Sequence, residues 1–457
     1  MTKISFPPAF EKRIHQQLGT SWDAFEQAHN EPSPVSIRLN PKKNTTPKNS
    51  TLVPWTSMGR YLSARPVFTL DPLFHGGAYY VQEASSMFLE QALMQAVDLR
   101  QPLKVLDLCA APGGKSTHIL GLIGENSLLV SNEVIRSRAT ILAENIQKWG
   151  CANVMVTNND PQEIGSITGF FDVIVVDAPC SGEGLFRKDP EAITEWSAEN
   201  VALCAGRQKR ILKDIWPALK ENGVLIYCTC TYNESENENN LSRLQQEQEI
   251  EFVDLKIDTS WGITKINNNG VVGYRCFPHQ VKGEGFFLAV IRKKENEGTI
   301  RHRNKRENNT FPKQLASTLR SWLLTAEQKE LIYHKETVRF IPLVHAEAME
   351  MLRSKLKVIS EGVDLGAVKH DKIIPEHALA LSVDVDQRQF QSISLNLDEA
   401  IRYLRREPIS VSGQKGFAMI MFENIPLGWI NILSNRVNNL YPSERRIRMA
   451  PPQRSTP

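Results

Sequence analysis

The sequence predicts an α/β fold in which a mostly parallel sheet occupies the middle of the chain. Two observations predict it. From residue 103 to residue 294, short apolar and β-branched runs alternate with segments of helical periodicity, as in consecutive β/α units. The regions before and after lack this alternation, and 457 residues are enough for two to four domains. We therefore expect a central α/β domain flanked by two regions of different character.

Composition excludes several classes of protein. Hydrophobic residues make up 41% and charged residues 23% of the chain, which is ordinary for a globular protein. No apolar run approaches the roughly 18–20 residues that span a membrane, and the N-terminus lacks the apolar stretch of a signal peptide, so we expect a cytoplasmic protein. Seven cysteines, an odd number, argue against a disulfide scaffold. The net charge of +3 is too small to indicate nucleic-acid binding by itself.

The central region supplies the elements of the expected sheet. Its apolar runs predict buried strands at 104–108, 128–133, 153–157, 172–177, 223–229 and 285–294. The intervals between them predict helices at 116–122, 136–148 and 200–219.

The flanking regions give weaker patterns. Residues 36–43 (SIRLNPKK) predict a short strand followed by a basic turn, and residues 81–97 have apolar residues at helical spacing. From about residue 374 onward, short β-like runs dominate, at 408–413, 416–424 and 425–433. The stretch 292–306 carries seven basic and two acidic residues, which suits a solvated linker as well as an RNA contact.

A glycine-rich loop, DLCAAPGGK (107–115), follows the first predicted strand. Paired glycines at a strand-to-helix turn let the backbone approach a ligand, and a helix N-terminus favours negative groups. The loop is not a P-loop, because Cys109 stands where that motif requires glycine, and the G-x-G-x-x-G pattern is absent. A nucleotide-like cofactor without a pyrophosphate remains. S-adenosylmethionine fits, since its carboxylate can meet the loop N–H groups and Lys115.

Two acids at later strand ends support a cofactor site. Glu133, twenty residues after Gly113, is placed to hold ribose hydroxyls, and Asp160 to meet the adenine edge. A single acid at a strand end is often just a helix cap. Here the loop and both acids fall at the carboxyl ends of successive strands, where open α/β sheets bind ligands.

Two thiols, Cys180 and Cys230, follow the fourth and fifth predicted strands. A buried cysteine is usually a small hydrophobe, which is our interpretation of Cys109, Cys151, Cys204 and Cys276. Zinc would require C-x-x-C spacing, whereas Cys230 is preceded by Cys228 with one residue between them and has no adjacent histidine, so we expect no metal.

A functional interpretation of the thiols starts from cytosine chemistry. Carbon 5 of cytosine takes a methyl group from a sulfonium once a thiolate has added to carbon 6. Such an enzyme needs a nucleophilic cysteine, a carboxyl near ring nitrogen 3 and a group that assists release. Asp177, Cys180 and Cys230 supply that set.

Several long motifs within residues 100–295 resemble the Sun/Nop family of RNA 5-methylcytosine methyltransferases, namely VLDLCAAPGGKS, DVIVVDAPCSGEGLFRKDP, YCTCTYNESENE and FPHQVKGEGFFLAV. The upstream HGGAYYVQEASSM and the long C-terminal extension resemble the bacterial RsmF-type 16S ribosomal RNA enzymes in particular. The resemblance implies a Rossmann-like class I methyltransferase core with a mostly parallel seven-stranded sheet. It also implies a C-terminal α+β extension that ends in a PUA-like module.

The resemblance also implies roles for individual residues. Cys230 would attack carbon 6, Cys180 would assist breakdown of the covalent adduct, and Asp177 would face both cofactor and base. DNA cytosine methyltransferases use the Pro-Cys thiol as nucleophile instead, so the presence of Cys230 favours RNA. Cys228 departs from the family pattern, and we interpret it as filler. The implied cofactor contacts are Cys109, Ala110, Ala111, Pro112, Gly113, Gly114, Lys115, Glu133, Arg138, Asp160 and Asp177.

We expect five segments along the chain. They are an N-terminal RNA-binding domain (1–72), the methyltransferase domain (73–295), a basic linker (296–312), an intermediate domain (313–373) and a PUA-like RNA-binding domain (374–457). Because the net charge is small, local basic clusters must grip RNA. Candidates are Arg38, Lys42, Lys43, the 292–306 run, Arg187, Lys188, Arg402, Arg405, Arg406, Arg445, Arg446 and Arg448. Arg187 and Lys188 have a competing interpretation as salt-bridge partners of Asp189 or Glu191, and we interpret His279 as structural.

The expected function is S-adenosylmethionine-dependent methylation of carbon 5 of cytosine in bacterial 16S ribosomal RNA or the small ribosomal subunit, by a monomer that binds no membrane. One alternative is the same chemistry on transfer RNA. Another is a non-catalytic ribosome-assembly factor that binds RNA. The presence of Cys230, Cys180, Asp177, Glu133 and Lys115 argues against the latter.

Overall fold

A computed structural model describes residues 4–45, 47, 49–268, 270–294, 313–334, 336–369 and 372–450. The predicted basic linker at 296–312 lies outside the described residues, as does the 295–306 part of the basic run. In the described part of the chain, no helix combines the length and apolar character needed to cross a membrane.

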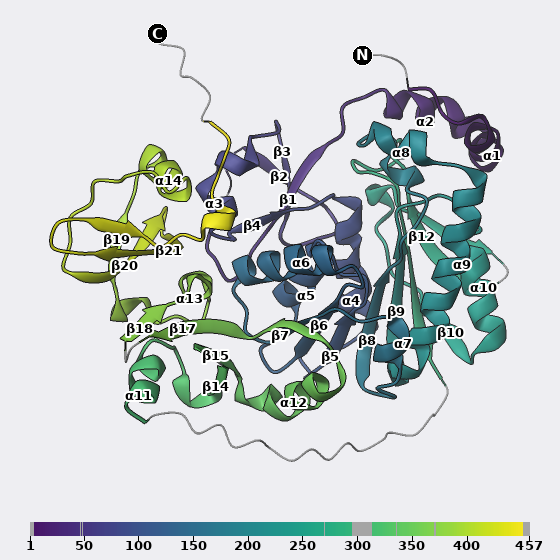
Figure 1. The fold of residues 1–457 in the computed structure, drawn as a ribbon. Coiled ribbons are helices and arrows are strands. Elements are labelled where there is room, and N and C mark those ends of the chain that lie inside the picture. Colours follow the sequence, from purple (N-terminus) through teal and green to yellow (C-terminus); the bar gives the residue numbers. More distant parts are fainter. Residues whose placement is uncertain are drawn as a thin grey trace, which may run out of the picture.

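The central sheet contains the predicted mostly parallel seven-stranded core, in the order β7-β6-β5-β8-β9-β13-β12 (Figure 1). Adjacent strands run parallel except for β13, which is antiparallel to both β9 and β12. The sequence predicted six of the seven. The bounds are β5 (Lys104–Asp107), β6 (Leu128–Asn132), β7 (Val154–Thr157), β8 (Phe171–Asp177), β9 (Leu219–Thr229), β12 (Val271–Cys276) and β13 (Phe286–Lys293).

Three further strands widen this sheet to ten. They are β10 (Ile250–Phe252), β11 (Thr264–Asn268) and β16 (Val358–Glu361). Sequence reasoning missed β11, which is polar and partly exposed and carries none of the apolar pattern of a buried strand, and it also missed β12, although that strand is largely buried. Strand β16 comes from the region after residue 313 and pairs antiparallel with β7. The C-terminal part of the chain therefore supplies one edge of the central sheet.

Helices cover both faces of the sheet because alternate strand residues point to opposite sides. Val105 packs in one core with α4 (Leu89–Ala96), α5 (Gly114–Leu122) and α6 (Arg136–Trp149). Leu106 packs in the opposite core with elements of the other face, namely α7 (Pro161–Gly165), α9 (Ala198–Ile215), α10 (Glu238–Glu247) and α12 (Ala346–Lys355).

Two helix predictions need correction. Helix α9 ends at Ile215 rather than at residue 219, because Pro217 lies in the following 3₁₀ turn and β9 begins at Leu219. The helical pattern at 81–97 begins as strand β4 (Tyr79–Val81) and a 3₁₀ turn, and only Leu89–Ala96 is α-helical. In both cases the periodicity identified the helix, and local backbone chemistry displaced one of its ends.

The N-terminal region forms a small antiparallel sheet in the order β2-β3-β1-β4. The strands not yet given bounds are β1 (Val35–Leu39), β2 (Ser50–Leu52) and β3 (Gly59–Leu62), and the helices of this region are α1 (Pro8–Leu18), α2 (Trp22–His29) and α3 (Pro72–His75). Helices α1 and α2 lie beside α8 (Pro190–Glu195), far along the chain, as Figure 1 shows. Phe10 and Phe186 join these segments in one aromatic cluster, with ring centroids 4.9 Å apart.

The predicted basic turn near the N-terminus packs inward. Arg38 and Lys43 are buried, and the Lys43 ammonium donates to the carbonyls of Gly76 and Lys148. Lys42 pairs with Glu125 at 3.4 Å. Arg38 and Lys43 are therefore not RNA contacts: their charges satisfy backbone carbonyls of neighbouring elements.

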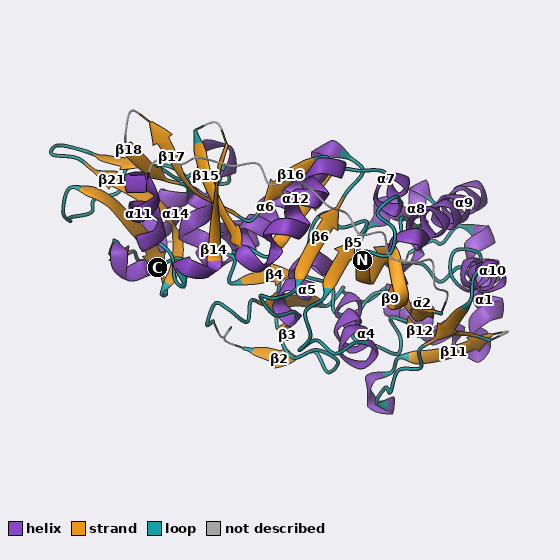
Figure 2. Ribbon diagram, turned by 90° about the horizontal axis from the view of Figure 1, so that it is seen from below, coloured by secondary structure: helices purple, strands orange, loops and turns teal. Residues whose placement is uncertain are grey.

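The C-terminal third contains two more four-stranded sheets, in the orders β14-β15-β17-β18 and β19-β20-β21-β22. Figure 2 shows them at one end of an elongated molecule, with α9 and α10 at the other. Their strands are β14 (Lys329–His334), β15 (Thr337–Pro342), β17 (Val363–Lys369), β18 (Lys372–Pro375), β19 (Gln391–Ser394), β20 (Gly416–Phe422), β21 (Ile425–Ile432) and β22 (Val437–Asn439). The helices are α11 (Lys313–Ser321), α13 (His377–Leu381) and α14 (Leu397–Leu404).

One β-like run is not a strand. Residues 408–413 alternate in the manner of a strand, and Ile409 and Val411 pack on the core of the last sheet, yet the segment is irregular. The other two runs form the hairpin β20–β21. Alternation indicated which residues face the core, but strand formation also requires a hydrogen-bonded neighbour.

Candidate active site

The predicted site residues converge on one pocket of about 500 Å³ at the carboxyl ends of the central strands. Of the predicted cofactor and catalytic residues, those lining it are Cys109, Ala111, Glu133, Arg138, Asp177, Cys180 and Cys230. The others, Ala110, Pro112, Gly113, Gly114, Lys115 and Asp160, are not lining residues. Four strands separated in sequence, β5, β6, β8 and β9, thus bring the cofactor loop and both thiols to one place.

The glycine-rich loop turns sharply between β5 and α5. Gly113 has φ of 113°, a conformation that side chains disfavour, and a Cβ there would meet Leu142 Cδ1 at 3.3 Å. Two side chains from α6 fix the loop: Arg138 donates to the Ala111 carbonyl at 2.9 Å, and Asn145 donates to the Pro112 carbonyl at 2.8 Å. The loop is therefore held rigidly against the next β/α unit.

Glu133 presents its carboxylate to the pocket from the end of β6. It is almost fully buried, accepts a hydrogen bond from the Ile135 N–H at 2.9 Å and pairs with Arg138 at 3.3 Å. Asp160 instead caps α7, accepting from the Gln162 N–H, and pairs with Arg210 at 3.5 Å. Asp160 thus acts as the N-cap of α7, the alternative role expected for a single acid at a strand end, and its contact with adenine stays a prediction.

A partly exposed ion pair joins the glycine-rich loop to the end of β8. The Lys115 ammonium lies 2.7 Å from an Asp177 carboxylate oxygen. Burial disfavours the lysine charge, but Asp177 outweighs it and keeps the pKa of Lys115 above its usual value. Beside them Asp107, which sequence reasoning missed, accepts a hydrogen bond from Ser116 at 2.6 Å, and burial raises the pKa of its carboxyl to about 7.

The sulfur atoms of Cys180 and Cys230 lie 3.0 Å apart. Both residues are partly exposed, and the Cys230 N–H donates to the Cys180 sulfur at 3.3 Å. The hydrogen bond with Cys230 and burial raise the pKa of the Cys180 thiol well above its usual value. Cys228, by contrast, is fully buried in the apolar core, in keeping with its interpretation as filler.

Sequence reasoning missed several residues around the pocket. Arg207 and Arg210 of α9 line it, and their i, i+3 spacing, which puts both on one helix face, could have identified them. Glu236 lies buried behind both cysteine loops. Nothing in the sequence distinguished it from the neighbouring acids of the same motif.

Two predicted phosphate contacts separate in the structure. Arg187 is buried and pairs with Glu284 at 3.1 Å, so it is neither an exposed cation nor a partner of Asp189 or Glu191. Lys188 is exposed and lines a groove of about 1000 Å³ together with Arg65, His279 and Lys282, and Arg187 also lines this groove although its charge is paired with Glu284. The His279 ring packs against Phe25 and Phe277 and makes no hydrogen bond to backbone.

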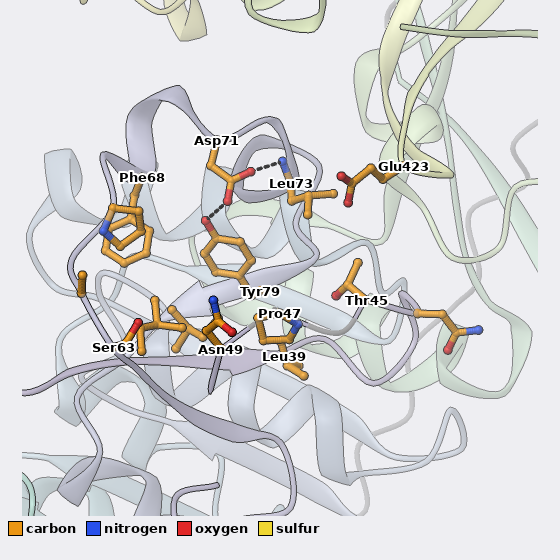
Figure 3. A pocket seen from close by; sticks show the side chains of 15 residues that line it. Leu39, Thr45, Pro47, Asn49, Ser63, Phe68, Asp71, Leu73, Tyr79 and Glu423 are labelled. Atoms are coloured by element: carbon orange, nitrogen blue, oxygen red, sulfur yellow. Dashed lines mark hydrogen bonds between the residues drawn. The ribbon is translucent and has the colours of Figure 1, made fainter. Parts of the chain in front are cut away.

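A separate pocket of about 540 Å³ lies between the N-terminal sheet and the turn after β20 (Figure 3). There the Asp71 carboxylate accepts hydrogen bonds from the Tyr79 hydroxyl at 2.5 Å and the Leu73 N–H at 2.9 Å. Its lining holds no cysteine, whereas Cys109, Cys180 and Cys230 line the pocket at the carboxyl ends of the central strands. Across the described ranges, no group of three or more His, Cys, Asp or Glu residues could hold a metal ion.

Three family models match the chain. They are described as 16S rRNA methyltransferase RsmB/F (residues 94–292), the N-terminal domain of 16S rRNA methyltransferase RsmF (residues 6–84) and the methyltransferase RsmF PUA domain (residues 390–447). The central match covers the strands that carry the candidate site.

Curated relatives match along most of the chain. The ribosomal RNA small subunit methyltransferase F of Salmonella arizonae is 30% identical over 479 residues, which covers 96% of each chain. That of Enterobacter sp. (strain 638) is 29% identical over 470 residues, with the same coverage. The protein of the same name from Shewanella denitrificans is 34% identical over 331 residues, covering 68% of this chain and 64% of the relative.

Solved structures match the fold of about two thirds of the chain. A methyltransferase homolog from Pyrococcus horikoshii has a TM-score of 0.54 and 27% identity, covering 63% of this chain and 96% of the homolog. NSun6 from Pyrococcus horikoshii, solved with SFG, has a TM-score of 0.53 and 19% identity, covering 64% and 99%.

Proposed function

The chain belongs to the ribosomal RNA small subunit methyltransferase F family, and from that premise we propose that it methylates carbon 5 of a cytosine in 16S ribosomal RNA through a covalent adduct on Cys230. It is an S-adenosylmethionine-dependent ribosomal RNA methyltransferase. The observation that carries the finer proposal is the pair of thiols, with sulfurs 3.0 Å apart, in the pocket that the cofactor loop also lines.

The pocket residues fit S-adenosylmethionine, which supplies an electrophilic methyl group on a sulfonium. A volume of about 500 Å³ suits a small-molecule site. Glu133 offers carboxylate oxygens that can accept hydrogen bonds from ribose hydroxyls, and Cys109 and Ala111 bring loop backbone to the pocket edge. We propose that these residues, with Arg138 beside them, hold the cofactor.

In the proposed first step, the Cys230 thiolate forms a bond to carbon 6 of the target cytosine. The Asp177 carboxyl gives its proton to ring nitrogen 3 as the thiolate adds, and Lys115, 2.7 Å away, stabilises the carboxylate that remains. The adduct makes carbon 5 nucleophilic, so that it can accept the methyl group.

Release requires transfer of the carbon-5 proton to water and cleavage of the bond between carbon 6 and sulfur, whose electron pair leaves with the Cys230 sulfur. We propose that the Cys180 thiol donates its proton to the departing Cys230 sulfur, because 3.0 Å is within transfer distance. A raised pKa keeps Cys180 protonated at neutral pH, as this role requires.

The base must leave its stack, so the RNA backbone needs positive surface near the pocket. We propose that Lys188, Arg65 and Lys282, which line the neighbouring groove, contact phosphates there. Leu185, on the same loop as Lys188, lines the catalytic pocket, which ties the two regions together.

We also propose the five-segment division of the chain. Two features bear on its boundaries: β4 pairs with β1 although it follows residue 72, and β18 spans residues 372–375 and pairs with β17. The N-terminal sheet therefore extends past the proposed boundary at residue 72, and the sheet that contains β17 and β18 extends past the proposed boundary at residue 373.

The test is transfer of labelled methyl groups to three unmethylated RNAs: naked 16S RNA, assembled small subunits and transfer RNA, followed by mapping of the modified base. Label in 16S RNA as 5-methylcytosine supports the proposal. Label on transfer RNA alone would retain the chemistry and overturn the substrate. Binding of cofactor without transfer to any RNA would favour a non-catalytic RNA-binding factor.

A further inference from the structure

A buried carboxylate lies behind the two cysteine loops. Glu236, fully buried between β9 and α10, accepts through Oε1 from the Ser181 N–H at 2.8 Å and from Gln208 Nε2 at 3.2 Å. Its Oε2 accepts from the Ser181 hydroxyl at 2.5 Å and the Thr231 hydroxyl at 3.3 Å. Glu236 does not line the catalytic pocket, so it acts through its neighbours.

The partners of Glu236 are the residues next to the two thiols. Ser181 follows Cys180 and Thr231 follows Cys230, and the two hydroxyl oxygens lie 3.1 Å apart. Gln208 of α9 also donates to the Pro179 carbonyl at 2.9 Å. The loop is therefore held immediately before and immediately after Cys180, and one of the two anchors also reaches the loop of Cys230.

The carboxylate itself is well fixed. The Tyr227 hydroxyl donates to the Glu236 carbonyl at 2.7 Å, which anchors its backbone to β9. All the donors to the side chain are neutral groups, so the interaction is a set of hydrogen bonds rather than an ion pair. Only a carboxylate can accept on both oxygens; an amide would turn its NH2 group either toward the Ser181 N–H and the Gln208 amide, which are donors, or toward the Ser181 and Thr231 hydroxyls, which could then no longer donate to it.

We propose that Glu236 is a positioning residue that sets the distance between the Cys180 and Cys230 sulfurs. The inference rests on the roles proposed above for the two cysteines. A proton passes between the thiols only when they are close, and a displacement of about 1 Å in an active site can cost about 100-fold in rate. Glu236 restrains both loops at once, so its loss should separate the sulfurs rather than remove either one.

The first experiment measures the thiols directly. Full-length protein is treated with diamide, which oxidises the two thiols to a disulfide and is itself reduced to a hydrazine by the two hydrogens. Formation of the Cys180–Cys230 disulfide is followed by peptide mass mapping. We expect Glu236→Gln to slow this reaction at least tenfold. Glu238→Gln is the matched control, because Glu238 is also buried, at 3% exposure, but pairs with Arg275 and binds neither Ser181 nor Thr231, and it should react at the wild-type rate.

The second experiment measures turnover with RNA. We expect Glu236→Gln to lower kcat at least tenfold, leave KM for RNA within about twofold, and accumulate protein–RNA adduct that survives denaturing gels. A wild-type disulfide rate together with a wild-type kcat would overturn the positioning role. Absence of adduct in every protein would contradict the covalent mechanism, while the diamide rates would still decide the positioning role.

A pair of milder variants tests the same contact if Glu236→Gln does not fold. Thr231→Val removes the hydroxyl that Glu236 binds, and Thr231→Ser keeps it. We expect slow disulfide formation in the valine variant and a near wild-type rate in the serine variant. Equal rates in the two variants would overturn the proposal.

Discussion

Cys180 and Cys230 are fifty residues apart in the chain, yet their sulfurs meet because β8 and β9 are parallel neighbours that end at the same edge. The sequence predicted this meeting, since both thiols follow buried strands. It could not predict Glu236, because the burial of one acid among several in a loop depends on side-chain packing around it. Nor could it show that Lys115 would pair with Asp177.

The first residue prediction concerns the nucleophile. Cys230→Ala should lower the rate of methyl transfer at least 1000-fold, because no other thiol that lines the pocket occupies its place. The affinity for the cofactor should change less than about threefold. Methyl transfer is measured with labelled cofactor and affinity by calorimetry. Substantial residual activity would contradict the assignment, and Cys204→Ala, which changes a thiol outside the pocket lining, is the control.

The second concerns release. Cys180→Ala should still allow attack by Cys230 but slow elimination, because the proton donor 3.0 Å from the sulfur is gone. A covalent protein–RNA complex should therefore accumulate on denaturing gels. If the complex forms with Cys230→Ala instead, the roles of the two thiols are exchanged.

The third concerns Asp107. Burial raises the pKa of this carboxyl to about 7 from an ordinary value near 4, so its contribution to stability is present below pH 4 and is lost as pH rises through 7. Asp107→Asn should remove that dependence. Between pH 4 and 8 the wild type should lose on the order of 4 kcal/mol more unfolding free energy than the variant. Denaturant titrations at several pH values measure the difference, and parallel pH curves would contradict it.

Elements of the central domain followed the sequence closely because parallel strands buried on both faces give continuous apolar runs. The prediction failed where an element is exposed, as in β11, or where alternation lacked a pairing partner, as at 408–413. Arg38 of strand β1 shows a further limit of sequence-based prediction. Charge in the sequence suggested RNA contact, whereas the Arg38 guanidinium packs 4.6 Å from the Trp149 ring and donates to Gln82 and to Thr117 of α5.

A prediction at this scale follows for Arg38, which joins β1 to the helix after the cofactor loop. Arg38→Met should lower the unfolding free energy by about 3 kcal/mol, because buried acceptors lose their donor, and should weaken cofactor binding. The salt dependence of RNA binding should not change. Arg65→Met, at an exposed groove position, should instead reduce the salt slope by about 0.7. A reduced slope for Arg38→Met would contradict its buried role.

Across the whole molecule, the C-terminal third supplies part of the catalytic domain's structure. Strand β16 covers the edge of β7, and Met349, Leu352 and Leu356 of the adjoining segment pack into the core on one face of the sheet. Sequence reasoning did not identify β16, because its four residues, Val358–Glu361, are too few to show an alternating pattern.

Truncation after residue 294 should therefore destabilise the methyltransferase domain. It removes these apolar contacts and leaves the β7 edge unpaired, so we expect a melting temperature lower by at least 5 °C and self-association through the open edge. Size-exclusion chromatography and thermal unfolding measure both. A shorter deletion after residue 376, which keeps β16, is the control, and equal behaviour of the two would contradict the prediction.

The late arrival of β16 also has a consequence for synthesis on the ribosome. Strand β7 ends at Thr157 and β16 begins at Val358, so about 200 residues separate the edge from the strand that covers it. At about 5–20 residues per second, the nascent chain carries an uncovered sheet edge for roughly 10–40 s. During that interval, translation speed and chaperone binding determine whether the β7 edge stays unpaired until β16 is synthesised or pairs with a strand of another chain.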